Sequence, residues 1–296
     1  MKENIACLSV IVIFSIVLVG CARNTDDVIT PISKNSEIDR ETIFLKDTFY
    51  DKDLFIRAVT SANLTDLNSK VIIVPHHLLA SEIIANLFLS IKKEGIDTVV
   101  IIGPNHEDNN ASTIGTAHLT WHTPFREVKT NTALVDSFSS YVNIHPLPEA
   151  FIEEHSIGAI IPFVRYYLPN AQVVPIIFNS TASLSDSKSV AQWLVENVQQ
   201  NTLVIVSTDF SHYLTEQDAD INDKITKDLI LNYEVEKIIE LNNDYIDSPA
   251  SLVSAMIYAK ESNLIPNILY NKNSNDFSER PFVETTSYFG IAFTEK

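Results

Sequence analysis

The chain has 296 residues, which suits one large α/β domain or two small ones, and 45% of them are hydrophobic, enough for a substantial core. The formal net charge of -17 is spread along the chain. This charge argues against nucleic acid as a partner, because phosphate contacts need clustered Lys and Arg, and it disfavours electrostatic docking on anionic lipid. The simplest interpretation is that the negative charge keeps the protein soluble.

The first residues predict a targeting segment. Lys2 forms a minimal basic region, and the apolar stretch 5–20 is too short for a comfortable membrane span. The stretch leads into Leu-Val-Gly-Cys, ending at Cys21, which resembles the bacterial lipobox, where the Cys thiol carries diacylglycerol. We therefore expect a signal peptide at 1–20, a lipid on Cys21 and an extracytoplasmic, membrane-anchored bacterial lipoprotein. An uncleaved signal anchor is the alternative.

The cysteines and the composition shift divide the chain. Cys7 would leave with the signal peptide and Cys21 would be lipidated, so the mature chain would have no free thiol and no disulfide. Thiol catalysis and Cys-ligated zinc are then excluded. Residues 21–47 are largely polar and lack a sustained apolar period, which predicts a tether. The apolar pattern of 48–296 continues without another linker and predicts one domain.

Alternating strand and helix patterns predict an α/β fold. Short β-branched runs read as buried parallel strands, and apolar residues at helical spacing lie between them. Such repetition gives a largely parallel sheet flanked by helices on both faces. The expected elements are strand 71–74, helix 81–93, strand 98–102, helices 132–141 and 156–168, strand 172–178, helix 183–198, strand 203–206, helices 217–231, 233–241 and 250–262, and strands 268–270 and 286–293.

Three of the 8 histidines come shortly after apolar strands: His76, His106 and His212. In an open α/β sheet, ligands bind outside the carboxyl ends of the strands, so these imidazoles are expected in one cleft. That pattern favours a metal site or an acid–base site. No GxGxxG, P-loop or GxSxG motif occurs, so nucleotide sites of the usual kinds and a nucleophile-elbow hydrolase are unsupported.

Acidic residues near the histidines extend the predicted site. Asp209 precedes His212 by three residues, and a carboxylate near an imidazole fixes its tautomer and raises its basicity. His155 follows two glutamates at a predicted helix start, where capping explains part of the motif, so a structural role and direct chemistry both stay open. Hydrolysis through Ser207 or Ser211 is disfavoured because neither lies in a strained nucleophile turn. We expect the remaining histidines, among them His118, at the surface.

Five motifs follow one another along the chain: Pro-His at 75–76, Gly-Pro-Asn-His at 103–106, Trp-His-Thr-Pro at 121–124, Glu-Glu-His-Ser at 153–156 and Ser-Thr-Asp-Phe-Ser-His at 207–212. This ordered set resembles the Memo family, also called AmmeMemoRadiSam system protein B, from about residue 54 to the C-terminus. That family is similar in fold to the class III extradiol dioxygenases, which are non-haem iron enzymes, so the resemblance implies an extradiol-dioxygenase-like fold. It implies that His76 and His106 are metal ligands and that His212 is the acid–base histidine, with Asp209 and His155 in the same cleft.

The sequence departs from the family at two points. The usual Pro-His-Ala-Gly-Tyr reads Pro-His-His-Leu-Leu at 75–79, and the Cys that is commonly the third ligand is matched by Asp247. Two His and one carboxylate are the facial arrangement of non-haem Fe(II) enzymes. The carboxylate shifts preference from Cu(I) to a divalent metal, Fe(II) first and Zn(II) or Mn(II) next, and it survives where a thiolate would oxidise. Alternatively, Asp247 caps the helix that begins near Ser248 or Pro249.

Two functions of different class follow. The first is a metal-dependent enzyme, an oxidoreductase or else a hydrolase, with the metal on His76, His106 and Asp247 and with His212, oriented by Asp209, as general base. The second is a non-catalytic protein that retains the fold and binds a peptide, small ligand or metal in the cleft, because fold alone does not settle function. Whether the protein is an enzyme stays open, and its expected partners are the membrane, through the lipid, and an unidentified small molecule or peptide.

Overall fold

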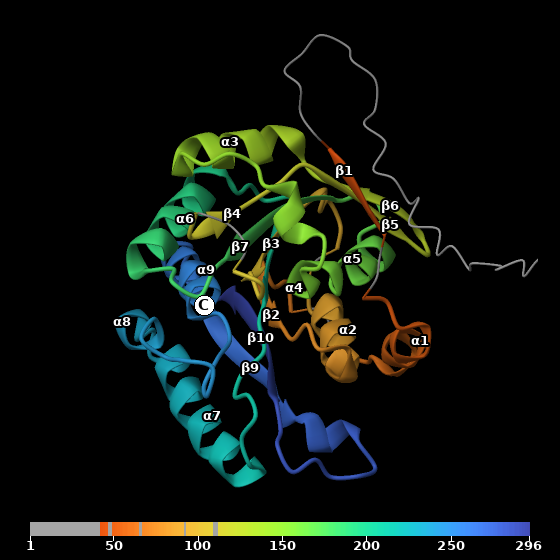
Figure 1. Cartoon of the computed structure of the whole chain (residues 1–296), viewed down its shortest axis with the longest axis vertical. Helices are drawn as coiled ribbons and strands as arrows, with labels where there is room; N and C mark the ends of the chain where they lie inside the picture. Colours follow the sequence, from red (N-terminus) through yellow and green to blue (C-terminus); the bar gives the residue numbers. More distant parts are fainter. Residues whose placement is uncertain (1–41, 47–48, 65–66, 92, 109–111) are drawn as a thin grey trace, which may run out of the picture.

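The computed structural model describes residues 42–46, 49–64, 67–91, 93–108 and 112–296 (Figure 1). The expected signal peptide, the lipid-bearing Cys21 and nearly all of the expected tether lie outside these residues. Within the described ranges, no helix combines the length and the apolar character that crossing a bilayer requires.

A seven-stranded sheet in the order β4-β7-β3-β8-β2-β10-β9 forms the centre of the molecule (Figure 1). The four strands β7, β3, β8 and β2 run parallel, while β4, β10 and β9 join antiparallel at the two sides. The sheet is therefore mixed, with a parallel centre. Its strands are β2 (Val71–Val74), β3 (Thr98–Pro104), β4 (Ile114–Gly115), β7 (Gln172–Phe178), β8 (Thr202–Ser207), β9 (Leu264–Asn273) and β10 (Ser287–Glu295).

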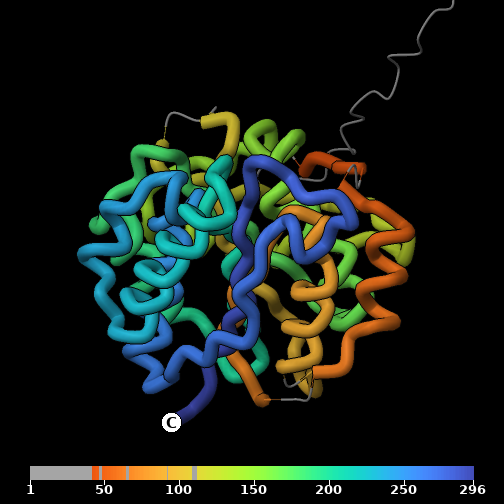
Figure 2. The backbone as a smooth tube through the Cα atoms, turned by 90° about the horizontal axis from the view of Figure 1, so that it is seen from below, coloured from red at the N-terminus to blue at the C-terminus, as the bar shows by residue number. Residues whose placement is uncertain are grey.

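Helices cover both faces of this sheet, as predicted, and they lie on opposite sides of it in Figure 2. One layer holds α1 (Lys52–Ser61), α2 (Ser81–Leu89), α4 (His155–Gly158) and α5 (Ile161–Tyr167). The other holds α3 (Thr132–Val142), α6 (Leu184–Asn197), α7 (Glu216–Leu231), α8 (Val235–Ile238) and α9 (Pro249–Glu261). Short 3-10 turns are η1 (Leu78–Ala80), η2 (Pro148–Phe151) and η3 (Ser274–Phe277).

Alternate side chains of each central strand enter different cores. In β3, Val99 and Ile101 face the layer of α2 and α5, whereas Val100 and Ile102 face the layer of α6 and α9. Both faces are buried, which is why these strands read as continuous apolar runs in the sequence.

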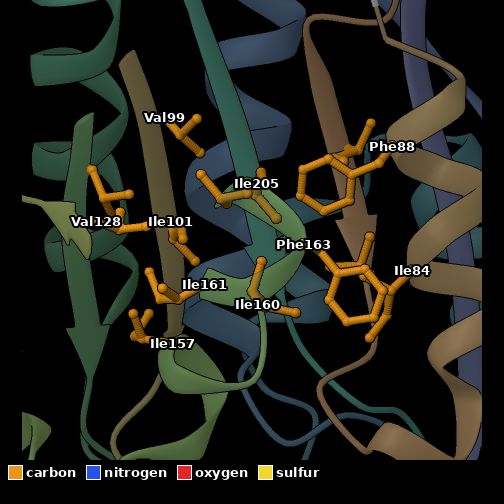
Figure 3. Close-up of a cluster of buried hydrophobic side chains, with 14 of the residues drawn as sticks. Ile84, Phe88, Val99, Ile101, Val128, Ile157, Ile160, Ile161, Phe163 and Ile205 are labelled. Carbon is orange, nitrogen blue, oxygen red and sulfur yellow. The ribbon is translucent and has the colours of Figure 1, made fainter. Parts of the chain in front are cut away.

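Figure 3 shows the first of these cores, with Ile84 and Phe88 of α2 beside Phe163 of α5 and facing Ile205 of β8. The rings of Phe88 and Phe163 are 6.2 Å apart at their centroids. Full burial of each such side chain stabilises the fold by about 1.5–3 kcal/mol. This packing fixes the strands whose carboxyl ends carry the histidines.

A second, three-stranded sheet lies beside the first. β5 (Leu119–Thr123) pairs parallel with β1 (Ile43–Lys46) and antiparallel with β6 (Arg126–Lys129). Ile43 and Leu45 of β1 are buried, so the fold includes residues that we expected to belong to the tether. The sequence pattern missed β1 because its three apolar residues are consecutive, so a four-residue strand shows no alternation.

Several expected elements have different bounds. The helix expected at 156–168 is broken into α4 and α5, because Pro162 has no backbone N–H and is tolerated only in a first helical turn. The expected helix 81–93 ends at Leu89, the expected helix 233–241 contracts to α8, and the strand expected at 268–270 extends to the whole of β9. His118, expected at the surface, is buried with its Nε2 2.9 Å from Asp136 Oδ1.

Candidate metal centre

The carboxyl ends of three adjacent parallel strands surround one cavity of about 1190 Å³. His76 follows β2, His106 follows β3, and Asp209 follows β8, each two residues past the end of its strand. His155, the first residue of α4, and Asp247, two residues before α9, line the cavity from the other side. His212 lines it too, so the structure brings all six predicted site residues of the domain to one cavity.

Three imidazoles form the centre of this cavity. His76, His106 and His155 each offer a ring nitrogen, and these three atoms lie within 4.8 Å of one another. The rings of His106 and His155 stack with centroids 4.0 Å apart, and His76 stands nearly perpendicular to both at 5.0 Å. Imidazole nitrogens this close together are a suitable donor set for a divalent transition metal. Sequence reasoning placed His155 in the cleft as a catalytic group and did not include it among the donors.

Asp247 adds a carboxylate to the imidazoles. Its Oδ2 lies 3.2 Å from Nε2 of His76 and 3.9 Å from Nε2 of His106. The same carboxylate accepts hydrogen bonds from the hydroxyl of Thr208 and from the backbone N–H of Asp209, the latter at 3.2 Å. Two elements distant in sequence, the turn after β8 and the segment before α9, therefore hold this carboxylate against the histidines.

The alternative role of Asp247 as a helix cap is wrong. The N-cap of α9 is Ser248, and Pro249 opens the helix without an N–H to be capped. The backbone of Ile246 pairs with that of Phe210, and the N–H of Asp247 donates to the carbonyl of Asp209. This pairing turns the carboxylate towards the cavity.

Burial and neighbouring charges set the protonation of the cluster. Burial alone lowers the pKa of His76, but the carboxylates of Asp209 and Asp247 outweigh it and raise that pKa to about 9. Burial raises the pKa of Asp247, yet His76 and the hydrogen bonds outweigh burial and hold the pKa at about 2. Burial, together with the imidazoles of His76 and His106, lowers the pKa of His155 to about 4, so a lone pair of His155 is free at neutral pH.

The expectation that Asp209 orients His212 is wrong. Oδ1 of Asp209 accepts the backbone N–H of His76 at 3.1 Å, and its Oδ2 lies 3.7 Å from Nε2 of the same residue. Between Asp209 and His212, the N–H of Phe210 donates to the carbonyl of Ser287, and the N–H of His212 donates to that of Asn243. Among the described residues, the carboxylate of Asp209 contacts His76 and makes no hydrogen bond or ion pair with His212. The buried Nδ1 of His212 has no hydrogen-bond partner among the described residues.

Glu154 is a buried residue that sequence reasoning did not select. Its carboxylate accepts the backbone N–H of His106 and that of Ser156, both at 2.7 Å, and lies 2.8 Å from Nδ1 of His106. Burial raises the pKa of Glu154, but the hydrogen bonds and charge of His106 lower it further, so the group is a carboxylate. The ionised carboxylate accepts a hydrogen bond from Nδ1–H of His106, so the lone pair of that imidazole is on Nε2. The sequence feature that could have indicated this role is the position of Glu154 directly before His155, the first residue of a helix.

Gly103 permits the close approach of α4 to β3. A Cβ at this position would lie 2.7 Å from the side-chain oxygen of Ser156, closer than real Cβ contacts allow. That oxygen donates to the carbonyl of Pro104 at 2.9 Å. The contact places His155 beside His106, and it depends on two segments about fifty residues apart.

The two serines considered for hydrolysis are occupied. Ser207 Oγ donates to the carbonyl of Ser156 at 2.5 Å, and Ser211 Oγ donates to Asp223 at 2.8 Å. Both side chains are fully buried and neither lines the cavity. A Ser-His-Asp mechanism is therefore without a free nucleophile at these positions.

Fold and site together define an α/β protein with a histidine-rich cluster, able to hold a metal ion, at the carboxyl ends of its parallel strands. The profile of the family described as Memo-like protein matches residues 48–280. The chain belongs to the Memo family, as its motifs indicated.

Curated relatives carry the same family name. The chain is 28% identical over 232 residues to the MEMO1 family protein of Caldivirga maquilingensis, covering 75% of this chain and 82% of the relative. It is 24% identical to that of Metallosphaera sedula, covering 71% and 78%, and 27% identical to that of Archaeoglobus fulgidus, covering 67% and 76%. A solved structure, the uncharacterized protein JW3007 of Escherichia coli K12, aligns with a TM-score of 0.49 at 8% identity over 75% of this chain and 98% of its own. At that level of similarity, the dioxygenase-like detail of the fold stays a prediction.

Proposed function

We propose that this Memo-family protein is a metal-dependent oxidoreductase that holds one divalent ion on His76, His106 and Asp247. The position of the Asp247 carboxylate against the Nε2 atoms of both histidines carries the proposal. Two histidines and a carboxylate suit Fe(II) first, and Zn(II) or Mn(II) next. His155 lies close enough to be a further nitrogen donor.

The donor set fits such an ion on physical grounds. At neutral pH the buried His76 is protonated and paired with Asp247 when no cation is present, so a metal ion would take the place of that proton. Neutral His155 needs no deprotonation to act as a donor. The hydrogen bonds that Asp209 and Glu154 accept fix the backbone of His76 and the ring of His106 before any ion arrives.

The residues around the ion would have separate tasks. A bound ion of this class acts as a Lewis acid and, where its oxidation state can change, exchanges electrons with a ligand. His212, which lines the cavity, would accept or return a proton through its imidazole. Phe49 and Phe178 would exclude water from one side of the cavity.

The alternative function is non-catalytic binding in the same cavity. Its volume of about 1190 Å³ is at or above the upper end of the usual range for small-molecule sites, about 300–1,000 Å³, which leaves room for a peptide. A retained ligand without stoichiometric metal would favour this alternative.

We also propose that the protein is a lipoprotein anchored outside the cytoplasm. Support comes from the apolar stretch 5–20 and the Leu-Val-Gly-Cys motif ending at Cys21. Mass spectrometry of the native protein should find a lipidated Cys21 as the first residue, and Cys21→Ser should move the protein out of the membrane fraction. An unmodified Cys21 or an intact Met1 would refute this proposal.

Metal analysis tests the proposed centre. Protein purified anaerobically without a His tag should contain about one ion per chain, and His76→Ala should contain none. His122→Ala is the matched control, because this exposed imidazole lies on β5, outside the cavity. Retention of the metal in His76→Ala, or its absence from the unmodified protein, would overturn the proposal.

A further inference from the structure

His77, next to His76, has a partner that the proposed chemistry does not use. Nδ1 of His77 lies 2.5 Å from the phenolic oxygen of Tyr288, which comes from β10. The side chain of His77 is exposed and lines the cavity beside His76 and His212. Tyr288 is fully buried, with its ring 5.9 Å from that of Phe277. The cavity therefore has a further imidazole, which is exposed and whose Nδ1 is hydrogen-bonded to a buried phenol.

The burial of Tyr288 decides the direction of this hydrogen bond. Within the described residues, Nδ1 of His77 is the one hydrogen-bond partner of the phenol. If Nδ1 carried the proton, the phenolic O–H would be buried without an acceptor, which is costly. The side chain of His77 is exposed and lines the cavity, so water or a ligand can satisfy Nε2 in either tautomer. In the other tautomer, Tyr288 donates its O–H to Nδ1 and His77 has its proton on Nε2. This arrangement leaves no buried polar group without a partner. Burial, with the Asp209 carboxylate, also raises the pKa of Tyr288, so the phenol keeps its proton.

We propose that Tyr288 fixes His77 as a hydrogen-bond donor, through Nε2–H, to an acceptor oxygen of the ligand that the cavity binds. This proposal rests on the proposed function, because it takes the cavity as a ligand site beside the metal. His77 is then a residue that selects for ligands with a carbonyl, hydroxyl or carboxylate oxygen, and Tyr288 is a positioning residue that acts through it.

The two side chains should act as a unit in binding. His77→Ala removes the donor, and Tyr288→Phe removes the group that fixes its tautomer, so the double variant should bind no worse than His77→Ala alone. His77→Gln keeps an N–H donor that does not depend on the phenol, so it should retain most of the affinity. Tyr141→Phe, on an exposed tyrosine of α3, is the matched control for loss of a phenolic hydroxyl.

The probe is acetohydroxamate, a small molecule that binds metal ions through its oxygen atoms. The protein is first loaded with Co(II), and binding of the probe is followed by the change in the visible spectrum of the Co(II) ion. His77→Ala should weaken binding about 2- to 12-fold, the usual range for one net hydrogen bond. Tyr288→Phe should weaken it by less, and Co(II) content should stay at one per chain in all variants. Unchanged affinity in His77→Ala would overturn the proposal, whereas failure of the unmodified protein to take up Co(II) would count against the metal site.

Nitrogen-15 NMR of the metal-free protein tests the pair independently of any ion. The ring of His77 should show the proton on Nε2, and Tyr288→Phe should give a mixture of tautomers. A merely structural tyrosine would leave the tautomer unchanged in that variant. A proton on Nδ1 in the unmodified protein would overturn the proposal, whatever the metal analysis finds.

Discussion

The two ends of the central sheet are both hollowed, yet their chemistry differs. The cavity at the carboxyl ends has a volume of about 1190 Å³, and a second hollow, of about 890 Å³, lies at the opposite end beside Lys70, Ile96 and Asn201. The first gathers buried histidines and carboxylates with strongly shifted pKa values. The second has an ion pair between Lys70 and Glu295 at 2.9 Å, with both side chains largely exposed.

Topology explains this difference better than size. Residues that follow parallel strands leave the sheet together at one edge, and in this chain the side chains placed there are imidazoles and carboxylates. At the other edge, Asp97 and Asn201 hydrogen-bond to each other at 2.8 Å in an exposed setting. Among the described residues, this hollow has no buried cluster of ionisable groups with shifted pKa values; Lys70 lowers the pKa of Glu295, an exposed group. Clustered pKa shifts in a cavity favour the carboxyl ends as the candidate functional site.

The largest expected effect is at Asp247. Asp247→Ala and Asp247→Ser should both abolish metal binding while the fold is retained, since the lost group contacts the imidazoles and two hydrogen-bond donors of one turn. Asp247→Cys should restore binding with a preference for softer ions.

Metal content and thermal unfolding of each Asp247 variant check this prediction. Asp244→Ala is the matched control, because this neighbouring aspartate is exposed and lies outside the cavity. Full metal occupancy in Asp247→Ser would contradict the role of the carboxylate as a ligand.

The second-largest effect is expected in the pH dependence of the stability of the metal-free protein. The pKa of His76 is raised from 6.5 to about 9, so its contribution to stability is complete below pH 6.5 and is lost as the pH rises towards 9. The pKa of Asp247 is lowered from 3.8 to about 2, so its contribution is complete above pH 3.8 and is lost as the pH falls towards 2. At 1.36 kcal/mol per pKa unit, each limb amounts to at most about 3 kcal/mol.

Urea unfolding of metal-free protein from about pH 2 to about pH 9 would measure both limbs. Stability should be highest between about pH 4 and pH 6.5, the window in which both groups contribute fully. His76→Gln should flatten the alkaline limb, and His122→Gln, at an exposed imidazole, should leave it unchanged. An alkaline limb that persists in His76→Gln would show that another group causes it.

A smaller effect is expected at Glu154. Glu154→Gln should weaken metal binding about 10- to 100-fold, the usual consequence of removing a carboxylate that orients a ligating histidine. The two carboxylate oxygens accept separate backbone N–H groups, those of His106 and Ser156, and the amide has a single acceptor oxygen, so Glu154→Gln can keep only one of these hydrogen bonds. Competition with a chelator would measure the affinity, with the exposed neighbour in Glu153→Gln as control. Equal affinities of the two variants would contradict a positioning role for Glu154.

Local patterns predicted the parts of the site that follow strands, and long-range contacts decided the rest. His76 and His106 were predictable because each comes two residues after an apolar run. The partner of Asp209 was not, because its carboxylate contacts His76, which lies 133 residues away in the sequence. The contact of His155 with His106 was not predictable either. It depends on the close packing of Gly103 against Ser156, two residues far apart in the sequence.

The smallest effect is expected at the opposite end of the sheet, and it tests the comparison directly. Lys70→Met removes the ion pair with Glu295, whose side chains are 44% and 75% exposed. Solvent and salt screen such a pair, so its loss should change neither the unfolding midpoint measurably nor the metal content. Calorimetry and metal analysis beside His76→Ala would show whether the two ends are independent. Loss of metal from Lys70→Met would mean that the amino end of β2 influences the site at its carboxyl end. The two ends of the sheet would then not be independent.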